Sequence, residues 1–490
     1  MTSRLTRRTF LKSTLAASAA ASLPARIYSQ ASGANDDIRI AVIGFNQRGQ
    51  NHISEYLKLK GVRIAALCDV DSGVLDKGKA QLAKKSTDVE TYKDIRKLLE
   101  NKDIDAISIA TPNHWHSLAA IWGCQAGKDV YVEKPVSHNV WEGRQLVKAA
   151  EAHKRIVQMG VQSRSAVGIA AGLEWLQAGN LGKLVYVRGL CYKRRASIGK
   201  ADGPLKIPDS IDFDLWCGPA SNEPIRREKL HYDWHWVWNT GNGDLGNQGI
   251  HQMDIARRFL GEPELSPKVF AVGGRVGYED DGETPNSMFL FHDYEKAPLI
   301  FEVRGLPEKT DAKGMDKYRG ASIGVIAQYE KGYVLNPNYN DAIAFDNDGN
   351  EIQKFTFATA GGGDAEREDH FANFLKAVRS RNVQDLNGKI IDGHISSALC
   401  HTGNISYRVG KQAGADAIRE KIKGNKEAMD SFERLATHLA ANNVDLNIEK
   451  LTLGEFLKFD PKTEKFIGNK DADALLTRKY RAPFVVPEKV

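Results

Sequence analysis

Several features that define other protein classes are scarce or absent in this chain. Its 490 residues include only five cysteines, none spaced as CxxC, so we expect structural thiols and neither a disulfide framework nor a cysteine metal site. No internal repeat is present, which argues against solenoid proteins. No apolar run is long enough to cross a bilayer, so we expect no membrane span. The composition is that of a globular protein, 42% hydrophobic and 27% charged, with room for two or three domains.

An excess of charge of one sign is also missing once the first 31 residues are set aside. The formal net charge is +6, but that segment holds five basic residues and no acidic one. Taking these five from 68 leaves 63 basic residues against 62 acidic ones. A nearly neutral remainder offers no basic patch, so we expect no nucleic-acid partner.

The basic leader has the order of an export signal. In "TRRTFLK" two arginines precede Phe10 and Leu11, and the short, weakly apolar stretch "STLAASAAASL" follows. Residues 1–31 resemble a twin-arginine signal peptide, cleaved between Ala25 and Ala31; a disordered basic terminus is the alternative. We therefore expect the twin-arginine export machinery as a partner and a periplasmic or secreted protein. Because this route carries folded proteins, it suits one that takes up a cofactor in the cytoplasm.

Short apolar runs alternate with amphipathic stretches from residue 38 to about residue 158. The runs "IRIAVI", "RIAALCD", "IDAISIA" and "DVYVE" read as buried strands, with helical periodicity near residues 50–59, 74–84, 95–99, 117–126 and 140–153. Continuously apolar strands separated by helices predict a doubly wound parallel sheet, a Rossmann-type NAD-binding domain over residues 32–160. Its ligand site should lie at the carboxyl ends of the strands.

The pattern changes after residue 164. Helical stretches near residues 169–178 and 246–260 precede strand-like runs, from "KVFAVGGRV" to "IQKFTFA", that follow one another through short turns. This predicts a second α/β domain over residues 161–413 with a large open, mostly antiparallel sheet. We expect this domain to bind the substrate and to form a homo-oligomer through the open sheet. Residues 414–490 are charged and irregular, and we expect a C-terminal extension that packs back on the domains.

The first strand runs into an altered dinucleotide fingerprint. The stretch "IAVIGFNQRG" keeps Gly44 and Gly49 of GxGxxG, but Asn46 replaces the middle glycine. Asparagine tolerates a left-handed backbone, and a helix beginning near Gln47 can offer N–H groups to a pyrophosphate. Asp69 lies 25 residues after Gly44, where a carboxylate accepts hydrogen bonds from ribose hydroxyls and repels a 2'-phosphate. NAD is therefore favoured over NADP, although a solvated turn aspartate is the alternative reading.

Two further strands end in polar residues. "SIATPNHWH" and "DVYVEKP" supply, after their strands, Thr111, Pro112, Asn113, His116, Glu133 and Lys134. A lysine at this edge of a parallel sheet can hydrogen-bond a substrate hydroxyl and help take its proton during hydride transfer. A solvated surface charge is the alternative.

The combination of "TPNHWH", "AGKDVYVEKPVS" and "GNGDLGNQGIHQMD", in this order, resembles the Gfo/Idh/MocA family, named for glucose-fructose oxidoreductase and inositol dehydrogenase. The resemblance runs from about residue 38 to 410, and the leader with "DFDLWCGPA" resembles an exported branch. It implies hydride transfer between NAD or NADP and sugars or polyols. It also implies that Lys134 lies at the reacting carbon, that Asn113, His116 and Glu133 lie near the nicotinamide, and that a cis peptide precedes Pro135.

The family usually has an aspartate four residues before a histidine on one helix, and here Asn247 precedes His251. The i, i+4 spacing puts both on one face. Histidine can shuttle a proton near neutral pH, whereas asparagine cannot ionise. We therefore predict His251 as the general base, assisted by Lys134, and Asn247 as a substrate-binding residue. A buried structural histidine is the alternative.

The remaining predictions concern contacts. Further substrate-binding residues are expected at strand ends and in the tryptophan-rich stretch "HYDWHWVW": Gln162, Tyr192, Arg194, His235 and Trp236. That stretch, if extended, puts two histidines and an aspartate on one face, but no closed ligand set is evident and we predict no metal. The predicted cofactor contacts are Gly44, Asn46, Gln47, Arg48, Gly49, Asp69, Thr111, Pro112, Asn113, His116, Glu133 and Lys134.

The sequence thus predicts an exported NAD-dependent oxidoreductase that acts on CH–OH groups of a sugar, glycoside or cyclic polyol and holds its cofactor tightly. An NAD-dependent glycoside hydrolase, which oxidises a ring carbon, eliminates the aglycone and returns the hydride, is the second hypothesis. The third is a noncatalytic sugar-binding protein, which the presence of Lys134 and His251 argues against.

Overall fold

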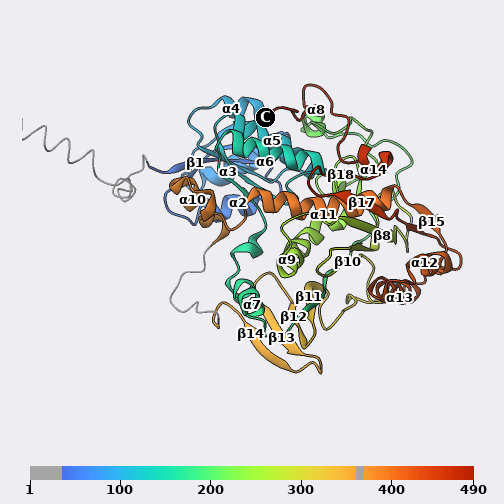
Figure 1. Cartoon of the computed structure of the whole chain (residues 1–490). Helices are drawn as coiled ribbons and strands as arrows, with labels where there is room; N and C mark the ends of the chain where they lie inside the picture. Colours follow the sequence, from blue (N-terminus) through green and yellow to red (C-terminus); the bar gives the residue numbers. More distant parts are fainter. Residues whose placement is uncertain (1–35, 360–368) are drawn as a thin grey trace, which may run out of the picture.

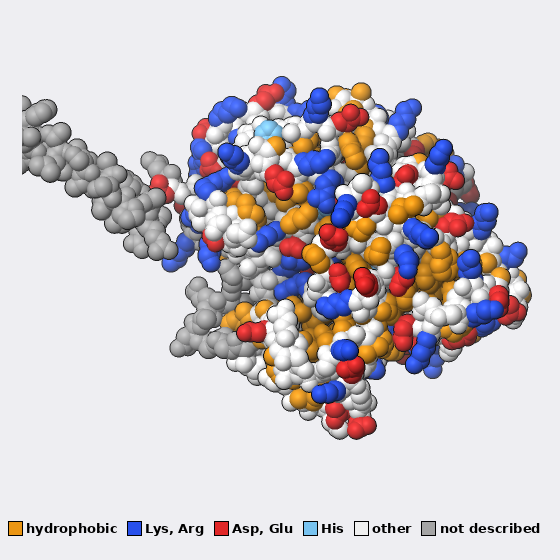
Figure 2. All heavy atoms as spheres, in the orientation of Figure 1, with side chains coloured by type: hydrophobic (Ala, Val, Ile, Leu, Met, Phe, Trp, Pro, Cys, Tyr) orange, Lys and Arg blue, Asp and Glu red, His pale blue; other side chains and the backbone are white. Residues whose placement is uncertain are grey.

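The computed structural model describes residues 36–359 and 369–490, and these form two α/β domains that lie against each other (Figure 1). The predicted twin-arginine signal lies outside the described residues. All five cysteines are buried and free. Over the described ranges every helix is too short or too polar to cross a membrane. Basic and acidic side chains are interspersed over the face in Figure 2.

The first domain is built on a six-stranded sheet with the order β3-β2-β1-β4-β5-β6, all pairs parallel. Its strands are β1 (Ile38–Ile43), β2 (Val62–Cys68), β3 (Glu90–Tyr92), β4 (Ala106–Ile109), β5 (Asp129–Val132) and β6 (Val157–Met159). The connecting helices are α2 (Arg48–Tyr56), α3 (Ser72–Ala83), α4 (Ile95–Glu100), α5 (Asn113–Gln125) and α6 (Val140–Ala152). The strand order reverses between β1 and β4, and ligands bind at such a switch point.

The predicted doubly wound parallel sheet is therefore confirmed, and its first strand has the predicted bounds. Two strands were not anticipated, β3 and β6, each only three residues long. The β3 residues "ETY" are polar and largely exposed, so they carry no apolar run for a sequence pattern to detect.

The second domain has a twelve-stranded sheet with the path β14-β13-β12-β11-β7-β10-β9-β8-β16-β15, in which β17 also pairs with β8 and β18 pairs with β17. Strands β7 and β10 pair parallel and the other pairs are antiparallel, so the predicted mostly antiparallel sheet is confirmed. Its strands are β7 (Leu184–Tyr192), β8 (Lys268–Gly274), β9 (Ser287–His292), β10 (Leu299–Arg304), β11 (Ile323–Tyr329), β12 (Gly332–Asn336), β13 (Ala342–Asp346), β14 (Glu351–Phe355), β15 (Lys411–Ala413), β16 (Leu451–Leu453), β17 (Leu457–Asp460) and β18 (Lys465–Phe466).

One face of this sheet is covered by α7 (Val167–Gln177), α9 (Ile250–Leu260) and α11 (Ile390–Arg408), which share one apolar core with it. Met253 and Ala256 of α9 pack in that core with Val187 of β7 and Phe301 of β10. The helix predicted from residue 246 begins differently, because Leu245–Gly249 forms a π-helical turn that leads into α9. Such turns occur frequently at functional sites.

The opposite face is covered over β8, β9 and β10 by α12 (Ala415–Ile422) and α13 (Lys426–Ala441). Phe432 and Leu435 of α13 are buried there against Phe270 and Phe289. The expectation of an irregular tail was wrong, because residues 414–490 also contain three short strands, β16, β17 and β18, and the helix α14 (Lys470–Ala474). The apolar positions of α13 have helical spacing, but many charged neighbours obscure it. The chain's own helices thus cover this face over β8, β9 and β10, which is part of the sheet that was predicted to be open.

The chain returns to the first domain twice after the second sheet is built. Helix α10 (His370–Ser380) places Phe371 and Phe374 in the core beneath β1 and β2. Phe484 and Val486, near the end of the chain, join the core on the other side of that sheet. Both domains are therefore tied together by packing as well as by the linking segments.

Candidate active site

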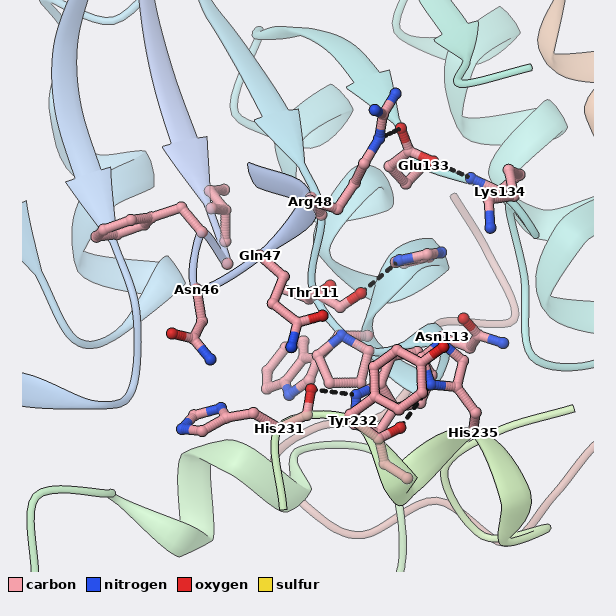
Figure 3. A pocket seen from close by; sticks show the side chains of 18 of the residues that line it. Asn46, Gln47, Arg48, Thr111, Asn113, Glu133, Lys134, His231, Tyr232 and His235 are labelled. Carbon is pink, nitrogen blue, oxygen red and sulfur yellow. Dashed lines mark hydrogen bonds and ion pairs between the residues drawn. The ribbon is translucent and has the colours of Figure 1, made fainter. Parts of the chain in front are cut away.

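A cavity of about 720 Å³ lies where the carboxyl ends of β1, β2, β4 and β5 face the second domain (Figure 3). Every predicted cofactor residue except Gly49 lines it, as do both predicted catalytic residues. Among the predicted substrate-binding residues, Gln162, His235 and Asn247 line it. The motifs that are far apart in the sequence therefore converge on one cavity.

The glycine turn after β1 has the close contacts that this motif requires. Gly44 has a φ of +74°, and a Cβ atom there would lie 2.8 Å from the backbone of Thr111. Gly49 lies beneath the turn, where a Cβ atom would lie 2.2 Å from the Gly44 oxygen, which explains why it does not reach the cavity. The tolerance of asparagine for a left-handed backbone is not used, because Asn46 does not have a positive φ. Its exposed side chain instead extends into the cavity (Figure 3).

Asp69 holds the glycine turn from the end of β2. Its carboxylate accepts hydrogen bonds from the backbone N–H groups of Phe45 and Asp71, both at 3.1 Å. Burial raises the pKa of Asp69, and these two hydrogen bonds oppose that shift. The carboxylate lines the cavity, so it both fixes the turn and faces the space beyond it.

A segment of the second domain, residues 204–242, reaches over this end of the cavity. Ile211 forms a β-bridge with Asp71, and the Nε2 atom of His231 lies 3.0 Å from the Asp71 carboxylate. The indole of Trp115 donates to the Leu215 carbonyl at 3.0 Å. Figure 3 shows His231 and Tyr232 across the cavity from Asn46 and Gln47. Sequence reasoning missed this cover, whose lining residues are Leu215, Trp216, His231, Tyr232 and Trp234.

The end of β4 supplies an unsatisfied hydroxyl. The Oγ1 atom of Thr111 is buried and has no hydrogen-bond partner among the described residues. His116 lies beside it, with one ring nitrogen 2.7 Å from the Thr111 carbonyl and the other 2.6 Å from the Pro135 carbonyl. Both nitrogens are thus engaged with backbone, so His116 ties two strand ends together. Asn113 donates to the side chain of Asn242 at 2.9 Å, which joins the two domains.

Glu133, at the end of β5, is a buried carboxylate with its own cation. Arg48 donates to it at 2.8 Å and the His52 ring lies at 3.0 Å (Figure 3). Burial opposes ionisation, but Arg48 and His52 outweigh it and hold the pKa of Glu133 well below its usual range. Gln162 donates to the hydroxyl of Tyr131 at 2.8 Å beside this group. The charge of Glu133 is therefore balanced inside the protein.

Lys134 follows Glu133 and joins the two domains at the centre of the cavity. Its Nζ atom donates to the backbone oxygen of Asn247, in the π-helical turn, at 2.8 Å. Burial lowers the pKa of Lys134 to about 8, although Glu133 opposes the shift. The peptide bond to Pro135 is cis, as the family resemblance implied.

His251 lies on the first turn of α9, on the side of the cavity formed by the second domain. Its Nδ1 atom is buried without a hydrogen-bond partner among the described residues, and its ring meets Tyr339 edge-on at 5.0 Å. Burial and the nearby Lys134 lower the pKa of His251 to about 3. The imidazole is therefore uncharged at neutral pH, and its Nδ1 atom has no hydrogen-bond partner among the described residues.

Three predicted substrate-binding residues lie elsewhere. Side chains alternate along a strand, and at the end of β7 it is Lys193 that lines the cavity while Tyr192 is buried on the other face. There the Tyr192 hydroxyl donates to Glu302 at 2.5 Å. Arg194 is exposed and bonds the Ala312 carbonyl. The predictions for Tyr192 and Arg194 were therefore wrong, because Lys193, the residue between them, is the one that lines the cavity.

Trp236 was also misplaced by the sequence reasoning. Residues Asp233–Trp236 form a 3₁₀ helix and not the extended segment that was considered. His235 consequently lines the cavity, whereas the Trp236 ring packs beneath the guanidinium of Arg195 at 5.1 Å. No group of three His, Cys, Asp or Glu side chains suited to a metal ion occurs within residues 36–359 and 369–490.

Comparisons with known proteins agree with this two-domain geometry. Residues 38–161 match the NAD-binding Rossmann-fold model of the Gfo/Idh/MocA oxidoreductase family, and residues 184–292 match the C-terminal alpha/beta domain model of the same family. The two matched segments cover the glycine turn, Lys134 and His251. These matches and the two-domain fold support the assignment of this chain as a Gfo/Idh/MocA family oxidoreductase.

Solved structures share the fold at low sequence identity. The WlbA dehydrogenase from Bordetella pertussis, in complex with NADH and UDP-GlcNAcA, is 18% identical with a TM-score of 0.54, over 74% of this chain and 94% of that one. A levoglucosan dehydrogenase, in complex with NADH and levoglucosan, is 18% identical with a TM-score of 0.55, over 74% of this chain and 95% of that one.

Curated relatives match over a shorter stretch. A glycosyl hydrolase family 109 protein from Shewanella sp. (strain W3-18-1) is 36% identical over 129 residues, which is 25% of this chain and 28% of that protein. A protein of the same name from Shewanella pealeana is 36% identical over 132 residues, with the same coverage. The match thus spans less than a third of the length of these relatives.

Proposed function

We propose that the protein is an NAD-dependent oxidoreductase that transfers hydride between a bound nicotinamide and a CH–OH group of a sugar, glycoside or cyclic polyol. One observation carries the proposal: Lys134 bridges the Rossmann sheet and the π-helical turn at Asn247, in the same cavity as the glycine turn. An amine at this position reaches both the cofactor side and the substrate side.

The residues present fit NAD. The turn at Gly44 has no room for a side chain, and the unsatisfied Thr111 hydroxyl and the Asp69 carboxylate both line the space beyond it. The amino terminus of α2 offers N–H groups to a pyrophosphate. The Asp69 carboxylate repels a 2'-phosphate, which supports NAD over NADP. When bound, the nicotinamide accepts the hydride.

The electrostatics support a division of roles that differs from the one predicted from the sequence. Lys134, with a pKa of about 8, is partly neutral near neutral pH, and the neutral amine can take the proton of the reacting hydroxyl. His251, with a pKa of about 3, is a weak base, so we assign its ring to hydrogen-bond the substrate in the cavity that it lines. Asn247 then positions Lys134 through its carbonyl.

The test of this function begins with the purified protein and its absorbance for co-purifying nicotinamide. Sugars and polyols are then added, and net NADH formation is the expected result. Lys134→Ala should lower turnover by about 10²- to 10⁴-fold, the range of general acid–base catalysis, while NAD binding is kept. Lys84→Ala, an exposed lysine after α3, is the matched control. Unchanged turnover in Lys134→Ala, or no nucleotide binding at all, would contradict the proposal.

A second function is favoured by the glycosyl hydrolase family 109 relatives. In that case a further base takes a proton next to the oxidised carbon as the aglycone leaves, water adds across the resulting double bond, and the hydride then returns to the same sugar. His235 and Tyr232 line the cavity and can fill that role. Release of the aglycone without net NADH distinguishes this hydrolase from the dehydrogenase.

We also propose that the protein is exported by the twin-arginine route to the periplasm or beyond, on the evidence of its leader. Cell fractionation of Arg7→Lys/Arg8→Lys against the unaltered protein tests this. A homo-oligomer is proposed as well, through the strands that α12 and α13 leave uncovered. Ile352 of β14 is 49% exposed there. Light scattering after size-exclusion chromatography measures the assembly.

A further inference from the structure

Two ammonium groups lie at the substrate end of the cavity, and neither has a carboxylate partner among the described residues. The Nζ atom of Lys134 bonds the Asn247 backbone oxygen, and the Nζ atom of Lys193 bonds the side-chain oxygen of Gln248 at 2.9 Å. Both lysines line the same cavity. An ammonium group held against a neutral oxygen keeps its full charge available to a ligand.

The carboxylates close to Lys134 are already paired. Glu133 is bound by Arg48 at 2.8 Å. Asp244 is bound by Arg195 at 2.6 Å and 2.9 Å. Each of these acids therefore has an arginine as its ion-pair partner, and neither lysine forms an ion pair with a carboxylate of the described residues. A buried or half-buried charge without a partner is costly, so a ligand anion would be favoured here.

The position of Lys193 is fixed by neighbouring side chains. Gln248 accepts its hydrogen bond and donates in turn to the hydroxyl of Tyr339, whose ring packs against His251 at 5.0 Å. An unrestrained lysine would extend toward solvent. Here the chain of contacts keeps the ammonium group beside the predicted reaction centre, with two N–H donors that bond no acceptor in residues 36–359 and 369–490.

The cofactor is not the anion that this lysine would bind. The site for a pyrophosphate is the glycine turn and the amino terminus of α2, on the Rossmann side. Lys193 comes from the end of β7 and contacts Gln248, close to His251, on the opposite wall. Oxidised nicotinamide carries a positive charge of its own, which adds to the demand for a negative group.

We propose that the substrate is a sugar that carries an anionic group, with a carboxylate as in a uronic acid as the first choice, and that Lys193 binds this group. The inference rests on the proposed function, because it concerns the same cavity. Lys134 then faces the hydroxyl that reacts, while Lys193 and the Gln248–Tyr339 pair set which sugars are accepted.

The experiment compares glucuronate with glucose on the NAD-loaded protein, by calorimetric binding and by steady-state oxidation. Glucose 6-phosphate and glucose 6-sulfate identify whether another anion is preferred. The variants are Lys193→Gln, Lys193→Arg and, as a control, Lys200→Gln, an exposed lysine that pairs with Glu279. Melting temperatures verify that each variant is folded.

The unaltered protein should prefer an anionic sugar. Lys193→Gln should weaken its binding and raise its KM on the order of 10- to 100-fold, as expected for loss of a charge-assisted hydrogen bond, while glucose changes by less than about twofold. Lys193→Arg should recover most of the loss, and Lys200→Gln should match the unaltered protein. Equal binding of neutral and anionic sugars, or an equal loss for both in Lys193→Gln, overturns the inference.

The two proposals fail in different ways. Oxidation of neutral sugars with no preference for anions leaves the oxidoreductase and removes the anion site. Binding of anionic sugars that depends on Lys193, without NADH formation or aglycone release, keeps the anion site and removes the oxidoreductase. Binding of neither kind of sugar overturns the anion site.

Discussion

The Nζ atom of Lys134 lies 2.8 Å from the backbone oxygen of Asn247, so the last residue before a cis proline in one domain is bonded to a π-helical turn in the other. This contact fixes the amine at the boundary between the cofactor side and the substrate side. It also places Lys134 under the electrostatic influence of groups from both domains, which makes its ionisation measurable.

Oxidation of the substrate should increase with pH around a midpoint near 8. Burial lowers the pKa of Lys134 to about 8; Glu133 and Asp244 oppose the shift, and Arg48 and Lys193 add to it. Only the neutral amine accepts a proton, so the active form is lost as the pH falls below this value. The measurement is the pH dependence of kcat for sugar oxidation.

A charge change beside Lys134 provides the control for this profile. Glu133→Gln removes the main group that raises the pKa of Lys134, so the midpoint should move to lower pH. Asp76→Asn, at an exposed position on α3, should leave it in place. A profile that is flat, or that shows no shift in Glu133→Gln, would count against Lys134 as the base.

Asp69 should set the preference between the two nicotinamide dinucleotides. Asp69→Asn removes the charge and keeps one oxygen. Phe45 and Asp71 donate to different oxygens of the Asp69 carboxylate, so one of the two hydrogen bonds is lost and the other should still hold the turn. The Kd for NAD should rise by about two- to tenfold and the Kd for NADP should fall, because the repulsion of a 2'-phosphate is gone. Fluorescence titration of both nucleotides measures the ratio, and an unchanged ratio would contradict the role of Asp69.

The packing of α13 against the sheet should contribute strongly to stability. Phe432 is fully buried among Phe270, Phe289 and Leu435. Phe432→Ala should reduce the free energy of unfolding by about 3–5 kcal/mol, through lost burial and the cavity it leaves. Thr437→Ala, on the exposed side of the same helix, should change it by less than about 0.5 kcal/mol. Urea unfolding measures both, and similar values would mean that α13 is only loosely attached.

Local sequence patterns predicted the parts of the protein that depend on local chemistry. The run 38–43, apolar apart from Arg39, predicted a buried strand, and the glycine spacing and "EKP" located the cavity wall. The residues around Lys193 show where this reasoning stops. Which of Tyr192, Lys193 and Arg194 faces the cavity depends on the register of β7 against β10 and β11, and that register is set by the partners.

Long-range packing explains the other errors. The cover over the nucleotide end and Tyr339 come from loops whose positions depend on contacts with distant residues, such as the bond between Asp71 and His231. Charged residues between the apolar positions of α13 obscure their helical spacing in the sequence. The apolar side of this helix can be identified only when the sheet face that it covers is known. The cover, the position of Tyr339 and the packing of α13 could therefore be identified only from the folded structure.

The altered position of the fingerprint, Asn46, should help to retain the cofactor. Its side chain extends into the cavity opposite His231 and Tyr232, and its backbone is not left-handed, so a glycine is not required there (Figure 3). Asn46→Gly should speed NAD dissociation by about two- to tenfold, since a hydrogen-bonding amide is removed and the turn gains freedom. Asn46→Ala removes the amide while restraining the backbone, so it separates the two causes. Stopped-flow displacement of NAD gives the rates; dissociation that is unchanged in both variants would show that Asn46 has no part in retention.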